Sequence, residues 1–294
     1  MIELLIENQV LIRCSGEGTV AEVPHGVIAI GAYAFADCAR LEEIRLPKTV
    51  HTIGEHAFSG CVKLKEMKIP EAVKRVGAYA FERCALLADS EGFVIHRNCL
   101  FGYYGKAREP KIPSCITEIA SGAFLGCENV ERIVLPPRVR VIGALAFAHC
   151  KSLESIKLSP SVRHIGYGAF LNCKALKEIA VPEGVEVVED LLFDGCASLE
   201  SVVLPQSLRS IGSYAFSRCE NLGTLSVPTS VDVLGDYVFC FCGKLRSVTL
   251  PVSVRRIGAD IFSNCRKPAV CTEKGSFAQS FAKENKIPVI LYQA

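Results

Sequence analysis

The residues of this 294-residue sequence best suited to nucleophilic or metal chemistry are its fifteen cysteines and six histidines. A histidine beside a cysteine can activate the thiol, and His149 directly precedes Cys150, but adjacent side chains usually point apart. The closest approach to a metal motif, Cys240-Phe241-Cys242, lacks a second pair at zinc spacing. The sequence contains no Walker motif and no dinucleotide-binding glycine pattern. We therefore predict that the protein is not an enzyme and has no metal site and no cofactor.

Most of the cysteines belong to a repeat. Ten of them follow a phenylalanine by three residues, a spacing that fits one helical turn. A slot four residues before each phenylalanine usually holds glycine and recurs every 23 residues, with one longer jump from Gly77 to Ala120. Ten copies at a fixed period indicate a solenoid. The phenylalanines are Phe35, Phe58, Phe81, Phe124, Phe147, Phe170, Phe193, Phe216, Phe239 and Phe262.

The repeat also predicts the elements that surround these residues. Segments such as 41–46 alternate apolar and polar side chains, which is the period of a half-buried strand, and a proline usually ends them. One 23-residue copy cannot bury its own apolar side, so neighbouring copies must stack and pair their strands in parallel. We expect the phenylalanines to fill the interior of the coils, with the cysteines beside them as buried thiols rather than disulfides.

The pattern Cys-x-x-Leu-x-x-Ile-x-Leu-Pro-x-x-Val-x-x-Ile-Gly-x-x-Ala-Phe resembles the BspA-like (treponemal-type, 23-residue) class of leucine-rich repeat, over roughly residues 1–294. The resemblance implies an α/β fold. The expected form is a curved solenoid with a parallel concave β-sheet and short helical turns on its convex side. For function it implies only a shared binding scaffold, because the members of such families use one fold for many purposes.

A second, rarer unit occurs twice. Residues 1–30 and 93–119 align without a gap, and each predicts a β-hairpin, with turns near Asn8-Gln9 and Arg97-Asn98. At the far end, Ser276 and Gln279 have the spacing of a capping box, which predicts a helix between two strands. We expect the solenoid to end with this segment. The predicted organisation is one domain over 1–294, comprising a hairpin cap (1–29), repeats (30–92), an inserted hairpin unit (93–118), further repeats (119–265) and a C-terminal cap (266–294).

The usual binding surface of a leucine-rich repeat is its concave sheet. The outward positions of the predicted strands form two columns, charged in the N-terminal half and small and hydroxyl-bearing in the C-terminal half. This gradation predicts an elongated partner, either an extended peptide or another protein. The alternative is that any solvated sheet face needs polar residues. The positions are Glu43 and Arg45, Glu66 and Lys68, Arg132 and Val134, Ser155 and Lys157, Glu178 and Ala180, Ser201 and Val203, Thr224 and Ser226, and Ser247 and Thr249.

The inserted hairpin contains the densest aromatic cluster of the chain, Phe101, Tyr103 and Tyr104. One interpretation is an extra contact site that protrudes from the solenoid. The other is that these rings pack on the adjacent coils.

Charge and hydropathy exclude some classes of partner. The formal net charge is +2, so no global field favours nucleic acid or an anionic membrane. A basic ridge follows the strands and is a second candidate site, for phosphate or acidic glycan, although Glu186 and Asp232 interrupt it and no aromatic residues interleave with it. No apolar run approaches the ~18–20 residues of a membrane helix. The ridge consists of Lys74, Arg75, Arg138, Arg140, Arg163, His164, Arg209, Arg255 and Arg256.

The expected compartment is the cytoplasm. The N-terminus lacks the basic region of a secretory signal, and reduced cysteines are typical of a reducing compartment. If a signal has been trimmed from the sequence, the protein would instead be secreted or surface-bound. The alternative function is then an adhesin-like protein that binds host or matrix ligands. The sequence makes no prediction of oligomeric state.

Overall fold

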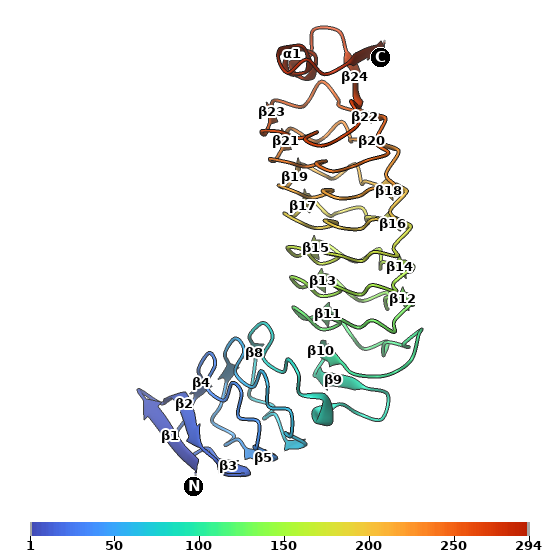
Figure 1. Ribbon diagram of the computed structural model, residues 1–294. Helices are drawn as coiled ribbons and strands as arrows, with labels where there is room; N and C mark the ends of the chain where they lie inside the picture. The colour runs from blue at the N-terminus through green and yellow to red at the C-terminus, as the bar shows by residue number, and fades with distance from the viewer. Residues whose placement is uncertain (1, 293–294) are drawn as a thin grey trace. The chain divides into compact units, whose positions relative to one another are not determined.

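The computed structural model describes residues 2–292, and its contacts divide the chain into two compact units. Unit 1 comprises Met1–Gly105 with Ala120–Ala123, and unit 2 comprises Lys106–Ile119 with Phe124–Ala294. Each unit is a stack of coils (Figure 1). The single domain expected from the sequence stays a prediction.

Unit 1 begins with an antiparallel hairpin whose turn, Asn8-Gln9, has φ angles of 48° and 64°. Two left-handed residues suit the twist of a tight hairpin. The second hairpin strand pairs in parallel with the first coil and buries Leu11, so the predicted N-terminal cap is confirmed. The elements are β1 (Ile2–Glu7), β2 (Val10–Gly16), β3 (Val20–Glu22), β4 (Ala29–Ile30), β5 (Glu43–Arg45), β6 (Thr52–Ile53), β7 (Glu66–Met67), β8 (Arg75–Val76), the 3-10 helix η1 (Ala85–Leu87), β9 (Phe93–His96) and β10 (Cys99–Tyr103).

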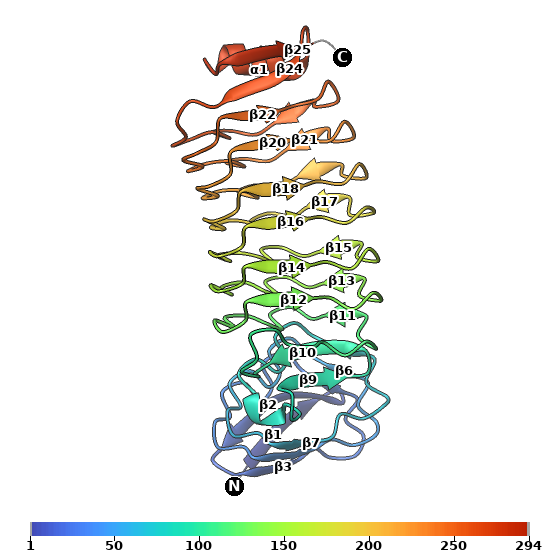
Figure 2. The ribbon, with the colours of Figure 1, turned by 90° about the vertical axis from the view of Figure 1, so that its right-hand side faces the viewer.

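Unit 2 carries two lines of parallel strands. The longer strands, one above the other in Figure 2, are β12 (Arg132–Val134), β14 (Ser155–Lys157), β16 (Glu178–Ala180), β18 (Ser201–Val203), β20 (Thr224–Ser226) and β22 (Ser247–Thr249). The shorter strands are β11 (Glu118–Ile119), β13 (Val141–Ile142), β15 (His164–Ile165), β17 (Val187–Val188), β19 (Ser210–Ile211), β21 (Val233–Leu234) and β23 (Arg256–Ile257). The longer strands are those expected from the alternating pattern. The shorter strands were not predicted, because two residues are too few to show alternation.

The segment around each phenylalanine is a series of single turns, not a helix. Successive bonds join residues three apart, as from Ala169 N to Gly166 O (3.1 Å) and from Cys173 N to Phe170 O (3.1 Å). Left-handed residues flank the ring on both sides, with φ of 55° at Gly168 and 57° at Asn172. A left-handed residue every few positions prevents a helix from propagating. The short helical turns expected from the spacing are therefore isolated hydrogen-bonded turns.

The core is a stack of rings, as predicted. Nine of the ten repeat phenylalanines are fully buried, and Phe262 is half-buried. Adjacent rings lie face to face, for instance Phe147 and Phe170 with centroids 5.5 Å apart. The cysteines lie beside them as thiols rather than disulfides.

The C-terminal cap is confirmed as strand, helix and strand. These elements are β24 (Ala269–Glu273), α1 (Phe277–Glu284) and β25 (Val289–Tyr292), and β24 and β25 pair in parallel. Ser276 Oγ accepts a hydrogen bond from Gln279 N (3.1 Å), and Gln279 Oε1 accepts one from Gly275 N (2.7 Å). The Ser276 side chain thus caps the first turn, and the Gln279 side chain binds the backbone N–H that precedes the N-cap, so both side chains favour a helix that begins here. Within residues 2–292, α1 is the only α-helix.

Candidate functional site

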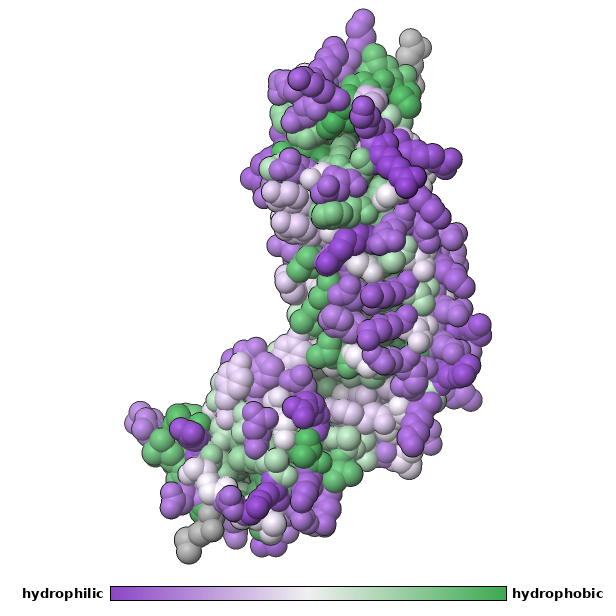
Figure 3. All heavy atoms as spheres, in the orientation of Figure 1, coloured by the Kyte–Doolittle hydropathy of each residue, from purple (hydrophilic) through white to green (hydrophobic). Residues whose placement is uncertain are grey.

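The outward positions of the longer strands in unit 2 form columns in register. Arg132 pairs with Ser155, Ser155 with Glu178, and Glu178 with Ser201. The second column places Ala180 beside Val203. We call this surface the strand face; it comprises Arg132, Val134, Ser155, Lys157, Glu178, Ala180, Ser201, Val203, Thr224, Ser226, Ser247 and Thr249. In Figure 3, hydrophilic side chains dominate the margin of unit 2 that carries these strands.

Two valines stand out on the strand face. Val134 is 64% exposed and Val203 is 62% exposed, more than any other large apolar side chain among the described residues. The strands alternate, so the residue between the outward positions points inward; Ile133, for example, is buried. The strand face therefore combines charged, hydroxyl and apolar side chains on a regular sheet surface.

Ion pairs lie on the strand face and on the turns beside it. Arg132 Nη1 lies 2.9 Å from Oε1 of Glu109, which is 23 residues earlier, and Lys177 Nζ lies 3.5 Å from Oε2 of Glu154, which is also 23 residues earlier. These side chains are well exposed, so each pair contributes little to stability. Their effect is to fix the positions of the charges that a partner would meet.

In unit 1 the equivalent positions line an open hollow of about 440 Å³. Glu43, Arg45, Glu66 and Lys68 all contribute to it. Glu43 and Glu66 are register partners on β5 and β7, while Arg45 Nε donates to Glu43 Oε1 (2.6 Å). The structure thus brings these four predicted residues together within unit 1. Their role in binding stays a prediction.

The aromatic cluster of the inserted hairpin does not protrude. Tyr103 is buried and its ring lies 5.0 Å from that of Phe93. Phe101 meets Phe81 edge-on at 5.7 Å, and Tyr104 Oη donates to Phe81 O (2.8 Å). The prediction of a protruding contact site is therefore wrong, and the alternative holds: the rings pack on the adjacent coil. They do so because they cover Phe81, the last ring of the stack in unit 1.

The candidate chemical residues are separated by the fold. His149 is exposed, whereas Cys150 Sγ is buried and donates to Phe124 O (3.1 Å). Cys240 Sγ donates to Ser217 Oγ (3.2 Å), while Cys242 Sγ donates to Phe216 O (3.1 Å). Among residues 2–292, no group of three or more His, Cys, Asp or Glu side chains is placed to hold a metal ion.

Sequence reasoning missed a stack of rings on the surface of unit 1. His56 lies between Tyr33 and Tyr79, with ring centroids 4.9 Å apart on each side. His56 Nδ1 is 3.4 Å from Glu82 Oε2, which also accepts a hydrogen bond from Ser59 Oγ (3.0 Å). The signal was the slot two residues before the phenylalanine, which holds an aromatic ring or histidine in three successive coils.

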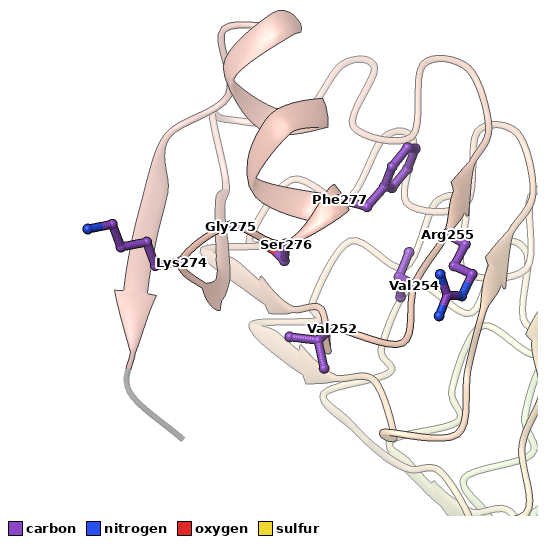
Figure 4. Close-up of a pocket in the computed structure, with 7 residues that line it drawn as sticks. All are labelled: Val252, Val254, Arg255, Lys274, Gly275, Ser276 and Phe277. Carbon is purple, nitrogen blue, oxygen red and sulfur yellow. The ribbon is translucent and has the colours of Figure 1, made fainter.

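A second hollow, of about 430 Å³, lies where the cap meets the last coil (Figure 4). Arg255 of the predicted basic ridge lines it, together with Lys274 and the residues that open α1. Figure 4 shows Lys274 turned away from Arg255. The two cations do not converge on one ligand, so this hollow is not a strong anion site.

Comparison with known proteins places these features in context. A family model described as "BspA type Leucine rich repeat region (6 copies)" matches residues 6–91, 94–193 and 140–269. A leucine-rich repeat protein from Bacteroides ovatus ATCC 8483 is 30% identical, with a TM-score of 0.58, over 92% of this chain and 69% of that one. None of the curated proteins matches.

Two further solved structures are similar. The leucine-rich repeat protein TpLRR of T. pallidum is 27% identical, with a TM-score of 0.34, over 76% of this chain and 87% of that one. The pneumococcal vaccine antigen PcpA is 18% identical, with a TM-score of 0.50, over 94% of this chain and 80% of that one. PcpA supports the fold alone. In residues 2–292 no helix has the length and apolar character needed to cross a bilayer.

Proposed function

Because the chain belongs to the BspA-type leucine-rich repeat family, we propose that it is a non-enzymatic scaffold that binds an extended segment of another protein through the strand face. The observation that carries this proposal is the pair of in-register columns with Val134 and Val203 exposed. Leucine-rich repeats typically serve as binding scaffolds, and the finer assignment to this face is ours.

The chemistry of the strand face suits an extended peptide. Such a peptide presents side chains at regular intervals, and a surface of parallel strands offers side chains at a matching regular spacing. Exposed valines supply the apolar contacts that usually anchor a partner, while Ser201, Thr224 and Ser247 supply hydroxyl donors and acceptors. Arg132 and Lys157 are positive and Glu178, on the next strand, is negative, and this asymmetry favours one direction of the peptide.

The hollow of unit 1 adds a second, charged contact in this proposal. Glu43 and Glu66 would attract basic side chains of the partner, and Lys68 would attract an acidic side chain of the same partner. We assign the protein to a reducing compartment, because its fifteen cysteines are free thiols, which are typical of such a compartment. The adhesin-like alternative requires export, so detection of the protein in culture medium would support that alternative.

The test is selection from a random peptide display library. Peptides are selected on the wild-type protein, and their affinities are measured for Val203→Asp, which adds a charge to the strand face. The matched control is Val252→Asp, because Val252 is similarly exposed (54%) but lies in the loop after β22. We expect at least tenfold weaker binding by Val203→Asp and unchanged binding by the control. Equal binding by both variants would refute the strand face as the site.

A further inference from the structure

A third hollow, of about 610 Å³ and also in unit 2, is strongly basic. It lies on the turns that lead into β20, β22 and β24, beside the strand face. Four cations line it, and none of the four forms an ion pair with another described residue. We call it the cationic hollow; its basic residues are Lys244, Arg246, Arg266 and Lys267.

Two of these cations, Arg246 and Arg266, occupy slots in which another coil of unit 2 has an ion-paired lysine. Lys177 pairs with Glu154 (3.5 Å), which lies 23 residues earlier on the previous coil. Arg246 occupies the slot of Lys177 three coils later, but the slot of Glu154 then holds Gly223. The repeat therefore supplies the cation without its usual acidic partner.

A second slot on these turns shows the same change from glutamate to glycine. Lys151 pairs with Glu128 (2.6 Å), again 23 residues earlier. Arg266 occupies the slot of Lys151 five coils later, and the slot of Glu128 then holds Gly243. Two independent columns have thus exchanged glutamate for glycine at the same place in the fold.

The fold does not demand glycine at either position. Neither residue has a left-handed φ, and a Cβ atom at Gly243 would meet nothing within 4 Å. A Cβ atom at Gly223 would meet only Arg246 Nη2, at 3.6 Å, which is ordinary van der Waals contact. The two glycines keep the hollow open and leave its cations uncompensated. Glu220 lies on the adjoining turn, where its backbone oxygen accepts a hydrogen bond from Lys244 N (3.0 Å), and it does not line the hollow.

We propose that the cationic hollow binds a multiply charged oxyanion, namely a sugar-sized ligand that carries several phosphate or sulfate groups. Guanidinium groups such as those of Arg246 and Arg266 form paired hydrogen bonds with such groups. The volume lies within the range of small-ligand sites. No aromatic ring lines the hollow, so it offers no stacking surface for a nucleobase. This binding is separate from the peptide binding proposed for the strand face.

The test uses two probes that carry the two kinds of group, sucrose octasulfate and inorganic tripolyphosphate. Calorimetric titration of the full chain at about 0.15 M salt should show saturable binding of at least one probe, weakening as salt increases. The probe that binds more tightly identifies sulfate or phosphate as the preferred group. Failure of both probes to bind would overturn the proposal.

Two variants restore the missing partners. Gly223→Glu and Gly243→Glu place carboxylates 23 residues before Arg246 and Arg266, and circular dichroism verifies that both variants fold. Each should weaken binding at least tenfold. The matched controls, Lys151→Gln and Lys177→Gln, remove cations that are already paired in the same columns, and should change affinity less than twofold. Wild-type affinity in both glutamate variants would also overturn the proposal.

Discussion

Cys173 Sγ lies 3.1 Å from the backbone oxygen of Phe147, one coil earlier, and donates a hydrogen bond to it. The same bond joins Cys196 to Phe170 (3.2 Å) and Cys219 to Phe193 (3.3 Å). A thiol is small and largely apolar, yet it is a weak donor. It therefore packs beside the ring stack and gives a second hydrogen bond to a carbonyl oxygen that already accepts one from a backbone N–H of its own turn, as Phe147 O does from Cys150 N (3.2 Å). This pairing explains why the two slots repeat together.

Truncation of a stacked ring should strongly destabilise the protein. Phe170 is fully buried and stacks on Phe147 and Phe193, with centroids 5.5 and 5.7 Å away. Phe170→Ala should lower the free energy of unfolding by about 3–5 kcal/mol, because the lost contacts leave a cavity. Chemical denaturation measures this loss. Phe241→Ala is the control, because that ring is 52% exposed, and a similar loss in both variants would contradict the ring-stack account.

The glycine slot is expected to be intolerant for reasons of space, not of backbone angle. A Cβ atom at Gly166 would lie 2.6 Å from Ala144 N and 2.9 Å from the carbonyl carbon of Gly143. Backbone atoms of the previous coil cannot yield as a flexible side chain can. Gly166→Ala should therefore cost about 1–3 kcal/mol of stability, as overpacking does. Gly243→Ala, which adds a Cβ atom in open space, should leave the denaturation midpoint nearly unchanged.

The period and the buried slots could be predicted from the sequence because each coil makes the same contacts as its neighbours. Phe170 and Cys173 are buried for reasons that every copy shares, so their repetition carries the information. The capping box of Ser276 and Gln279 was likewise predictable, since its chemistry is local. The positions of the strand-face columns followed from the two-residue period of strands.

Other features depend on contacts that no local pattern encodes. The left-handed turn residues could not be predicted from the sequence, because residues as different as Gly168, Leu145 and Tyr214 occupy the same slot. The inward packing of Tyr103 depends on where the hairpin meets the ring stack. The cationic hollow emerges only when ion pairs seen in some coils are compared with slots that lack them.

Glu189 stands in the glycine slot, and nothing in the structure explains that substitution.

Stability should fall in alkaline solution. Burial raises the pKa of the Cys84 thiol from its ordinary value of 9.0 to about 12. Between about pH 9 and pH 12 the unfolded chain loses this proton while the folded chain keeps it. The unfolded state then binds fewer protons, so the free energy of unfolding decreases with pH, by up to about 1.4 kcal/mol per pH unit for this thiol.

The contribution of this one thiol is isolated by a variant. Cys84→Ala should lower stability at neutral pH, since it removes buried atoms, but it should show a shallower decline between pH 9 and pH 11 than the wild type. Urea denaturation at each pH measures both slopes. Parallel slopes for the two proteins would mean that Cys84 ionises in the folded state as readily as in the unfolded chain.

Thiol reactivity offers a direct test of the non-enzymatic proposal. Cys115 is the one exposed cysteine of the fifteen, so a single thiol should react rapidly with a disulfide reagent at pH 8. Cys265 should follow, because it is half-buried and its interaction with the Cys242 side chain lowers its pKa. The buried thiols should react only as fast as the protein unfolds. Cys115→Ser should abolish the fast phase; a buried thiol such as Cys150 that reacted faster than Cys115 would point instead to an activated nucleophile, and so to catalysis.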